Sequence, residues 1–345
     1  KHWASVKRVV LGFASRNRIA SFALLLVCFG VLGYCVARLF AAYFAVALLS
    51  ALLALSAYLR SFLQKCRAPR LVLGTGPVVQ ALTSIPSLQR GPRPPIWAAH
   101  SFSQFGPWML QNMLHRRWPP RSEAHEFRAA DRLNKEDPDS PRTMVETLRA
   151  VLVPPRDDSL PLEAPVVVIL PGLACDAQDL PGQHTLLYAR GRGYRCAVLE
   201  RRGQWQPLAS ARFNIFGDAE DLELGVQQLR HLLPKAPFFL AGVSAGSALV
   251  VSALGKFDAR RKAGDTSAPA FLAAVDLFPG FDIAPGGCMV RSSPPYPAIM
   301  LESMRSRFVQ RNAELLQVFD SKAYEAAMAA QDCEAFMAAT APFAG

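Results

Sequence analysis

Acidic residues are missing from the first third of the sequence, where no aspartate or glutamate precedes Glu123. The same stretch contains 15 lysines and arginines, so its formal charge is +15, whereas the rest of the chain sums to −4 and the whole chain to +11. Anionic lipid headgroups attract basic segments of this kind. Because no zinc finger, RNA-binding sheet motif or basic zipper occurs, we expect membrane lipids and not nucleic acid as partners.

The cysteines form no recognisable pattern: the seven are odd in number, scattered, and contain no C-x-x-C pair. This argues against a disulfide framework and a zinc site, and it favours a reducing compartment. A glycine-rich phosphate-binding loop is missing as well. We therefore expect neither a cofactor nor a metal ion.

A long apolar run is present, in contrast, over residues 19–59, interrupted by Arg38. One bilayer crossing needs about 20 residues. Two spans joined by a turn near Gly33–Arg38 therefore fit the run, and so does one long tilted helix. Basic residues flank both ends of the apolar run, which favours placing these two ends on the same, positive side of the membrane. We predict that residues 1–70 anchor an integral membrane protein whose following domain lies on that side; mitochondrion, plastid and endoplasmic reticulum all stay open.

The remaining chain divides by composition into three parts. Residues 71–122 contain several prolines and are predicted to form a connector. Residues 123–280 alternate between apolar β-type runs and helical stretches, which is typical of a mostly parallel sheet with helices on both faces. Residues 281–345 are predicted to form a helical region with helices over Pro297–Phe319 and Lys322–Thr340.

The pentapeptide Gly242-Val-Ser-Ala-Gly246 follows an apolar run and precedes a helix-like stretch. A serine nucleophile elbow has this setting, because the two glycines let the strand and helix backbones approach around a strained serine. We predict Ser244 as the nucleophile, with the Ala245 N–H as one oxyanion donor at the helix N-terminus. An ordinary glycine–serine turn between a strand and a helix is the alternative.

Another predicted strand, Pro165–Leu170, ends in Pro-Gly-Leu. In α/β-hydrolases the loop after this strand supplies the second oxyanion amide. We assign that amide to Leu173, while a simple strand-to-helix turn stays the alternative.

With these motifs in view, residues 90–345 resemble the membrane-anchored abhydrolase-domain 1 and 3 subfamily of the α/β-hydrolase fold, which includes plant embryogenesis-associated proteins. The resemblance implies a serine ester hydrolase of the lipase or phospholipase type that forms an acyl-enzyme at a membrane surface. It also implies that the helical region 281–345 is a lid over the active site. The best-matched parts are Leu170–Leu173, Arg201–Gly203, Pro207-Leu208, Arg212, Asp221-Leu222, Gly242–Gly246 and Phe281-Asp282.

The sequence departs from the subfamily in one serious respect, because no histidine follows Ser244. The family order is serine, acid, histidine, so the expected acid and base would fall beyond Gly345 and the sheet would be incomplete at its C-terminal side. Asp276, near the end of a predicted strand, and His184 are possible stand-ins. Their plainer interpretations are a turn-capping carboxylate and a solvated helix residue.

Two functions therefore remain open. The first is a membrane-anchored serine hydrolase acting on lipid or other esters. The second is a catalytically inactive relative that serves as a structural subunit of a membrane complex, with a partner protein covering the unpaired sheet edge.

Overall fold

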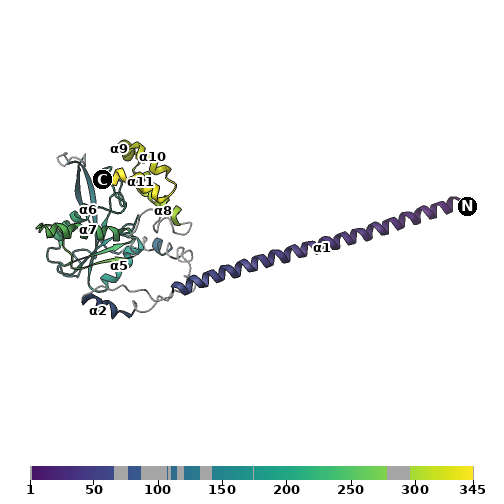
Figure 1. Ribbon diagram of the computed structural model, residues 1–345, viewed down its shortest axis with the longest axis horizontal. Coiled ribbons are helices and arrows are strands. Elements are labelled where there is room, and N and C mark those ends of the chain that lie inside the picture. Colours follow the sequence, from purple (N-terminus) through teal and green to yellow (C-terminus); the bar gives the residue numbers. More distant parts are fainter. Residues whose placement is uncertain are drawn as a thin grey trace. The chain divides into compact units, whose positions relative to one another are not determined.

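The computed structural model describes residues 2–65, 77–86, 107, 110–114, 120–132, 142–173, 175–277 and 296–344. The chain forms two compact units, Lys1–Met109 and Leu110–Gly345 (Figure 1). Most of the predicted connector lies outside the described residues, and so does the Phe281-Asp282 motif. The predicted domain boundaries stay predictions.

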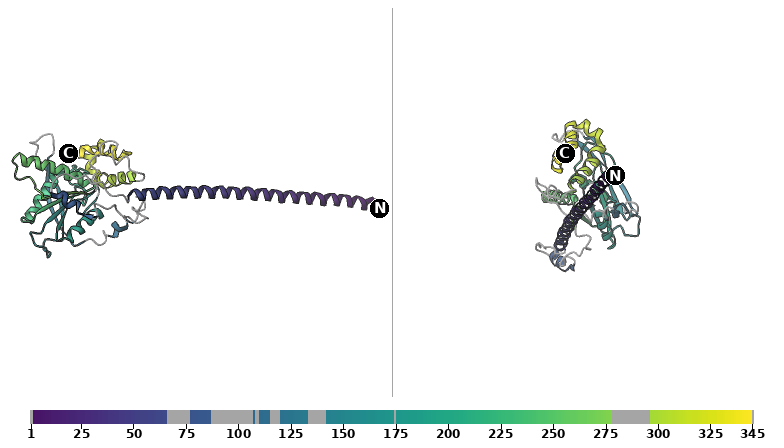
Figure 2. Two further views of the ribbon diagram at one scale, coloured as in Figure 1. Left: turned by 60° about the horizontal axis from the view of Figure 1, so that its bottom comes forward. Right: turned by 90° about the vertical axis from the view of Figure 1, so that its right-hand side faces the viewer.

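The first unit is dominated by α1 (His2–Lys65), a single helix of 64 residues that corresponds to a length of about 96 Å. Figures 1 and 2 show no break in it, so the structure has the single helix and not the hairpin with a turn near Gly33–Arg38. Its segment Leu25–Arg60 has a mean hydropathy of 2.2 and is long and apolar enough to cross a membrane, a test of length and composition alone. The short helix α2 (Pro77–Thr83) follows.

Arg38 has a local partner within α1, which explains how a helix tolerates it in an apolar run. Its Nε donates to the Tyr34 hydroxyl at 3.0 Å, one turn earlier. Its guanidinium lies 5.4 Å from the centre of the Tyr34 ring. Because the charged head is held along the helix surface, nothing at this position forces the backbone to turn.

The second unit contains a six-stranded sheet with the order β1-β2-β4-β3-β5-β6. The pairs β1–β2 and β2–β4 are antiparallel, whereas β4–β3, β3–β5 and β5–β6 are parallel. The predicted mostly parallel sheet is therefore confirmed. The strands are β1 (Glu123–Arg132), β2 (Arg142–Val153), β3 (Val166–Leu170), β4 (Arg195–Glu200), β5 (Phe238–Val243) and β6 (Ala274–Leu277).

Helices cover both faces of the sheet, as predicted. The helices α6 (Ala219–Leu232) and α7 (Ala245–Lys262) pack against one face, where Ala150 and Leu152 of β2 point. The helix α5 (Leu180–Arg190) packs against the opposite face, where Val151 and Val153 point. Alternate residues of a strand face opposite sides. Central strands buried on both sides are therefore continuously apolar, which is why they are visible in the sequence.

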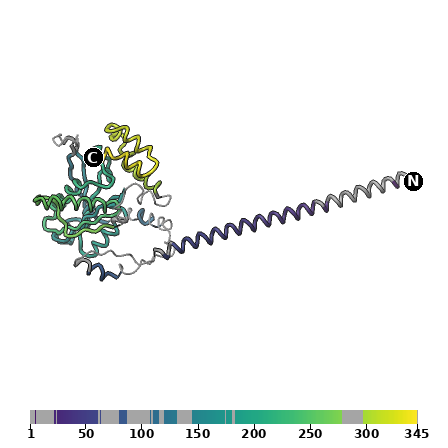
Figure 3. Tube along the Cα trace, in the orientation of Figure 1, coloured from purple at the N-terminus to yellow at the C-terminus, as the bar shows by residue number. Residues whose placement is uncertain are grey.

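The C-terminal helices form a cluster with its own apolar core, seen in yellow in Figures 1 and 3. The two helices predicted here are each divided. Asp320 and Asp332 accept hydrogen bonds from the Ala323 and Ala335 amides, so each carboxylate caps a new helix. The elements are α8 (Tyr296–Met304), the π-helical turn η2 (Arg305–Val309), the 3₁₀ turn η3 (Gln310–Asn312), α9 (Ala313–Phe319), α10 (Ser321–Ala329) and α11 (Cys333–Ala344).

A buried carboxylate in β2 holds the loop that follows β4. The Glu146 side chain is only 1% exposed. Its Oε2 accepts from the amides of Ala209 at 2.8 Å and Ser210 at 3.1 Å, and its Oε1 accepts from the Thr147 amide at 3.0 Å. Three amide donors satisfy this carboxylate, so its burial is compatible with a stable fold.

We predict that Glu146→Gln lowers the free energy of unfolding by about 2 kcal/mol, because one amide donor would then face the glutamine NH₂ group. Urea denaturation of the full chain in mild detergent, followed by tryptophan fluorescence, measures this change. The control is Glu325→Gln at an exposed position, which should shift stability by less than about 0.5 kcal/mol. Equal effects of the two substitutions would contradict the role assigned to Glu146.

Candidate active site

Ser244 lies at the turn between β5 and α7, with its side chain exposed. Its φ of 53° and ψ of −115° make it the one non-glycine residue with positive φ among the described residues. Such a backbone persists only where the surrounding structure enforces it. The sharp, strained strand-to-helix turn predicted from the sequence is therefore present around Ser244.

The two glycines of the motif are required by contacts between backbones. A Cβ atom at Gly242 would lie 2.6 Å from the Cα of Ser247, in the first turn of α7. A Cβ atom at Gly246 would lie 2.2 Å from the Leu170 carbonyl oxygen, at the end of β3. Neither contact involves a flexible side chain that can move aside. The spacing G-x-S-x-G thus lets α7 begin directly against two strands.

The loop after β3 lies against the serine. A Cβ atom at Gly172 would be 3.5 Å from the Cβ of Ser244, which is ordinary van der Waals contact. Leu173 follows in this loop and is half-buried, and Ala245 is the first residue of α7. Within the part of the chain that the structure describes, neither of these two amides donates to a backbone carbonyl. Ala245 directly follows the serine and Leu173 follows Gly172, and the assignment of their amides as oxyanion donors stays a prediction.

A buried arginine binds the backbone of the loop that follows β3. Arg201, directly after β4, donates from Nη1 to the Gly172 carbonyl at 2.8 Å and from Nη2 to the Pro171 carbonyl at 2.5 Å. Burial lowers the pKa of its guanidinium to about 10. The family resemblance includes Arg201 in a matched loop but assigns it no function. The contact was not predictable because it joins residues about 30 positions apart.

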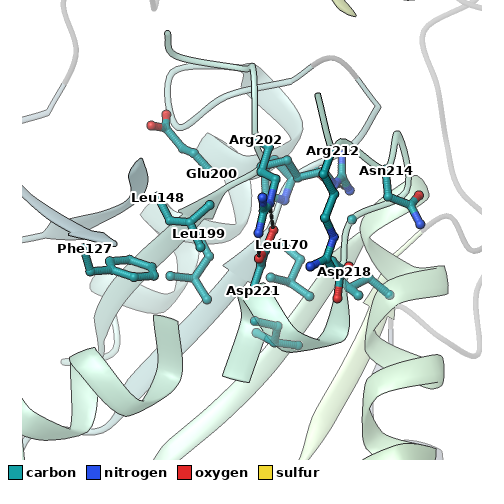
Figure 4. Close-up of a pocket in the computed structure, with 15 residues that line it drawn as sticks. Phe127, Leu148, Leu170, Leu199, Glu200, Arg202, Arg212, Asn214, Asp218 and Asp221 are labelled. Atoms are coloured by element: carbon teal, nitrogen blue, oxygen red, sulfur yellow. Dashed lines mark hydrogen bonds and ion pairs between the residues drawn. The ribbon is translucent and has the colours of Figure 1, made fainter. Parts of the chain in front are cut away.

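The cavity beside Arg201 is too small for a substrate, and it is lined by apolar side chains, such as Phe127 and Leu199, together with two ion pairs (Figure 4). Its volume is about 30 Å³, room for one or two water molecules. Arg202 forms a two-point ion pair with Asp221, with both distances 2.6 Å, and Arg212 pairs with Asp218. These pairs fasten the loop after β4 to the start of α6, so this cavity is structural.

The two stand-in residues have different locations. Asp276 lies on β6 opposite Gly242 in the strand register, and its buried Oδ1 has no hydrogen-bond partner among the described residues. Burial raises the pKa of this carboxyl. His184 lies exposed on α5, and among the described residues it forms no hydrogen bond with Ser244. The structure therefore brings Asp276, but not His184, to the elbow; both catalytic assignments stay predictions. No group of three metal-ligating side chains occurs in the described ranges.

The comparisons with known proteins confirm the resemblance to abhydrolase-domain proteins. Human phospholipase ABHD3 is 34% identical over 97 residues, which cover 28% of this chain and 24% of the relative. The mouse phospholipase ABHD3 is 35% identical over 97 residues, with the same coverage. Human protein ABHD15 is 42% identical over 71 residues, 20% of this chain and 15% of the relative. The chain thus matches about a quarter of the curated relatives' length or less.

No protein-family model matches the chain. Among solved structures, esterase B from Lactobacillus rhamnosis is similar at 14% identity, covering 64% of this chain and 72% of that one, with a TM-score of 0.33. A thermostable carboxyl esterase from Bacillus coagulans is similar at 13% identity, covering 59% of this chain and 52% of that one, with a TM-score of 0.30.

We predict that Gly246→Ala destabilises the protein by roughly 3 kcal/mol or prevents folding, because the new methyl group meets a backbone carbonyl. Gly255→Ala in the same helix is the matched control, since a Cβ atom there meets nothing within 4 Å. That substitution should instead stabilise by about 0.5–1 kcal/mol through helix propensity. Thermal melts of the full chain compare them, and a Gly246→Ala protein as stable as Gly255→Ala would refute the close approach.

Asp276 generates a prediction on pH dependence. Its pKa is raised in the folded state, so the ionised form opposes folding above that pKa, and the penalty disappears as pH falls toward the unfolded value. Asp276→Asn should therefore raise Tm at pH 8, and the gain should vanish near pH 4. Asp157→Asn, at an exposed carboxylate, is the control with little effect at either pH. A lower Tm of Asp276→Asn at pH 8 would show that the carboxylate is stabilised by a partner.

Proposed function

We propose that this chain acts as a membrane-anchored serine hydrolase of the lipase/esterase class, with Ser244 as its nucleophile. The observation that carries the proposal is the strained backbone of Ser244 at the elbow, with Gly172 so close that an added Cβ atom would touch the serine. A relative described as a phospholipase, ABHD3, supports an ester of a lipid as the substrate class.

In this proposal the Ser244 Oγ attacks the ester carbonyl carbon while a general base takes its proton. The carbonyl oxygen becomes an oxyanion that accepts from the amides of Leu173 and Ala245. The ester C–O bond breaks, the alcohol leaves with the proton, and water then hydrolyses the acyl-enzyme to a carboxylic acid. The start of α7 adds the positive end of its dipole at the point where negative charge develops.

The membrane part of the proposal rests on α1 and on the basic flanks. The 21 residues between Arg38 and Arg60 would extend about 32 Å as a helix, which matches the hydrocarbon thickness of about 30 Å. The excess of lysine and arginine before Glu123 favours contact with anionic headgroups. An enzyme held in this way would meet its lipid substrate at the bilayer surface; with a single helix the basic flanks lie on opposite sides of the membrane, so they do not select the side of the hydrolase domain.

A fluorophosphonate probe tests the proposal, because such probes label only activated serines quickly. We expect labelling of the full-length native protein in its membrane, and a loss of at least ~100-fold in Ser244→Ala. Ser252→Ala, at an exposed serine of the same helix, should label like the wild type. His184→Ala and Asp276→Asn in the same assay show whether either residue acts as the catalytic base or acid: a loss of labelling supports the role, and unchanged labelling rejects it. Labelling that survives in Ser244→Ala, or none in intact folded protein, would refute the proposal.

A further inference from the structure

We propose that Arg201 is a positioning residue that fixes the direction of the Leu173 N–H toward the oxyanion. This inference rests on the proposed function, in which that amide stabilises the oxyanion formed at Ser244. It assigns a task to a residue that follows β4 and lies outside the G-x-S-x-G motif.

The first step of the argument is the hydrogen bonding of the Gly172 carbonyl. Arg201 Nη1 donates to it at 2.8 Å, and the Cys175 amide donates to it at 3.1 Å. A carbonyl oxygen has two lone pairs, so both acceptor sites are used. The second guanidinium nitrogen holds the preceding carbonyl, of Pro171, at 2.5 Å. Two consecutive peptide groups of the loop are thus fixed by one planar side chain.

The second step is the geometry of the peptide bond. The Gly172 carbonyl and the Leu173 N–H belong to one planar trans peptide, so they point in opposite directions. Because Arg201 draws the carbonyl toward the interior, the N–H of the same peptide is directed away from the guanidinium. Gly172 itself lies against Ser244. A rotation of this single peptide would remove the Leu173 donor without moving the nucleophile.

The third step is that burying the Arg201 guanidinium is unfavourable for the stability of the fold. Its guanidinium is buried, and among the described residues its hydrogen bonds go to carbonyl oxygens, with no carboxylate as partner. Burying a cation without a counterion is unfavourable. Its neighbour Arg202 is equally buried but paired with Asp221. Residues that break such local rules are typical of functional sites.

Space for Arg201 is made by a glycine near the end of the same loop, just before α6. Gly217 has a φ of +95°, and a Cβ atom there would lie 3.1 Å from Arg201 Nε and 2.6 Å from Leu249 Cδ2. The arginine is therefore confined on several sides, which limits its rotamers. A confined side chain with two directed donors positions a loop better than a flexible one.

The test compares matched substitutions at neighbouring buried arginines in the full chain: Arg201→Met and Arg201→Lys against Arg202→Met and Arg202→Lys. We measure kcat and KM for a soluble p-nitrophenyl ester, Tm, and hydrogen–deuterium exchange of residues 171–178. All four variants lose stability if the arginines only support the fold. The positioning role predicts a kcat lower by about 100-fold in Arg201→Met with KM little changed. Arg201→Lys should lose less kcat than Arg201→Met, because the lysine ammonium can still donate a hydrogen bond to a loop carbonyl.

The Arg202 variants should keep kcat within about threefold of the wild type, and exchange of residues 171–178 should accelerate only in the Arg201 variants. Equal losses of kcat at both positions, or unchanged exchange in Arg201→Met, would overturn the inference. If Arg201→Met does not fold, Arg201→Lys decides by the same two readouts. If the wild type itself hydrolyses no ester and takes no fluorophosphonate, the proposed function fails; the exchange data then still decide whether Arg201 holds the loop.

Discussion

The close contact between the first turn of α7 and the ends of β3 and β5 is the constraint on which the site depends. Gly246 against the Leu170 carbonyl and Gly242 against Ser247 leave no room for a side chain. The serine between them is therefore held at positive φ, with its amide donating to Leu277 at the end of β6. The end of β6, the start of α7 and Ser244 are therefore positioned together.

The loop after β4 extends this constraint to the rest of the second unit. Its first residue, Arg201, fixes the loop beside the serine. Further on, Glu146 of β2 binds two of its amides, and Asn312 of the helical cluster accepts from the Leu208 amide at 2.8 Å. One irregular segment thus connects the Gly172 loop, the sheet and the helical cluster.

The sequence predicted the features that have a local signal. Buried parallel strands such as Val166–Leu170 are continuous apolar runs, and the elbow glycines have fixed spacing around Ser244. Features that depend on distant residues were missed: Glu146 binds amides more than 60 positions away, and Arg201 reaches a loop about 30 positions back. The undecided form of α1 has a similar cause, because an apolar run fixes helicity but not where a helix bends.

The most direct test of the account is an experimental structure of the full-length protein after reaction with a phosphonate ester. The account predicts a covalent bond from Ser244 Oγ to phosphorus. It also predicts a phosphoryl oxygen about 2.7–3.1 Å from the Leu173 and Ala245 amide nitrogens, with the Gly172 carbonyl still bound to Arg201. An adduct on another residue, or a phosphoryl oxygen that contacts neither amide, would contradict it.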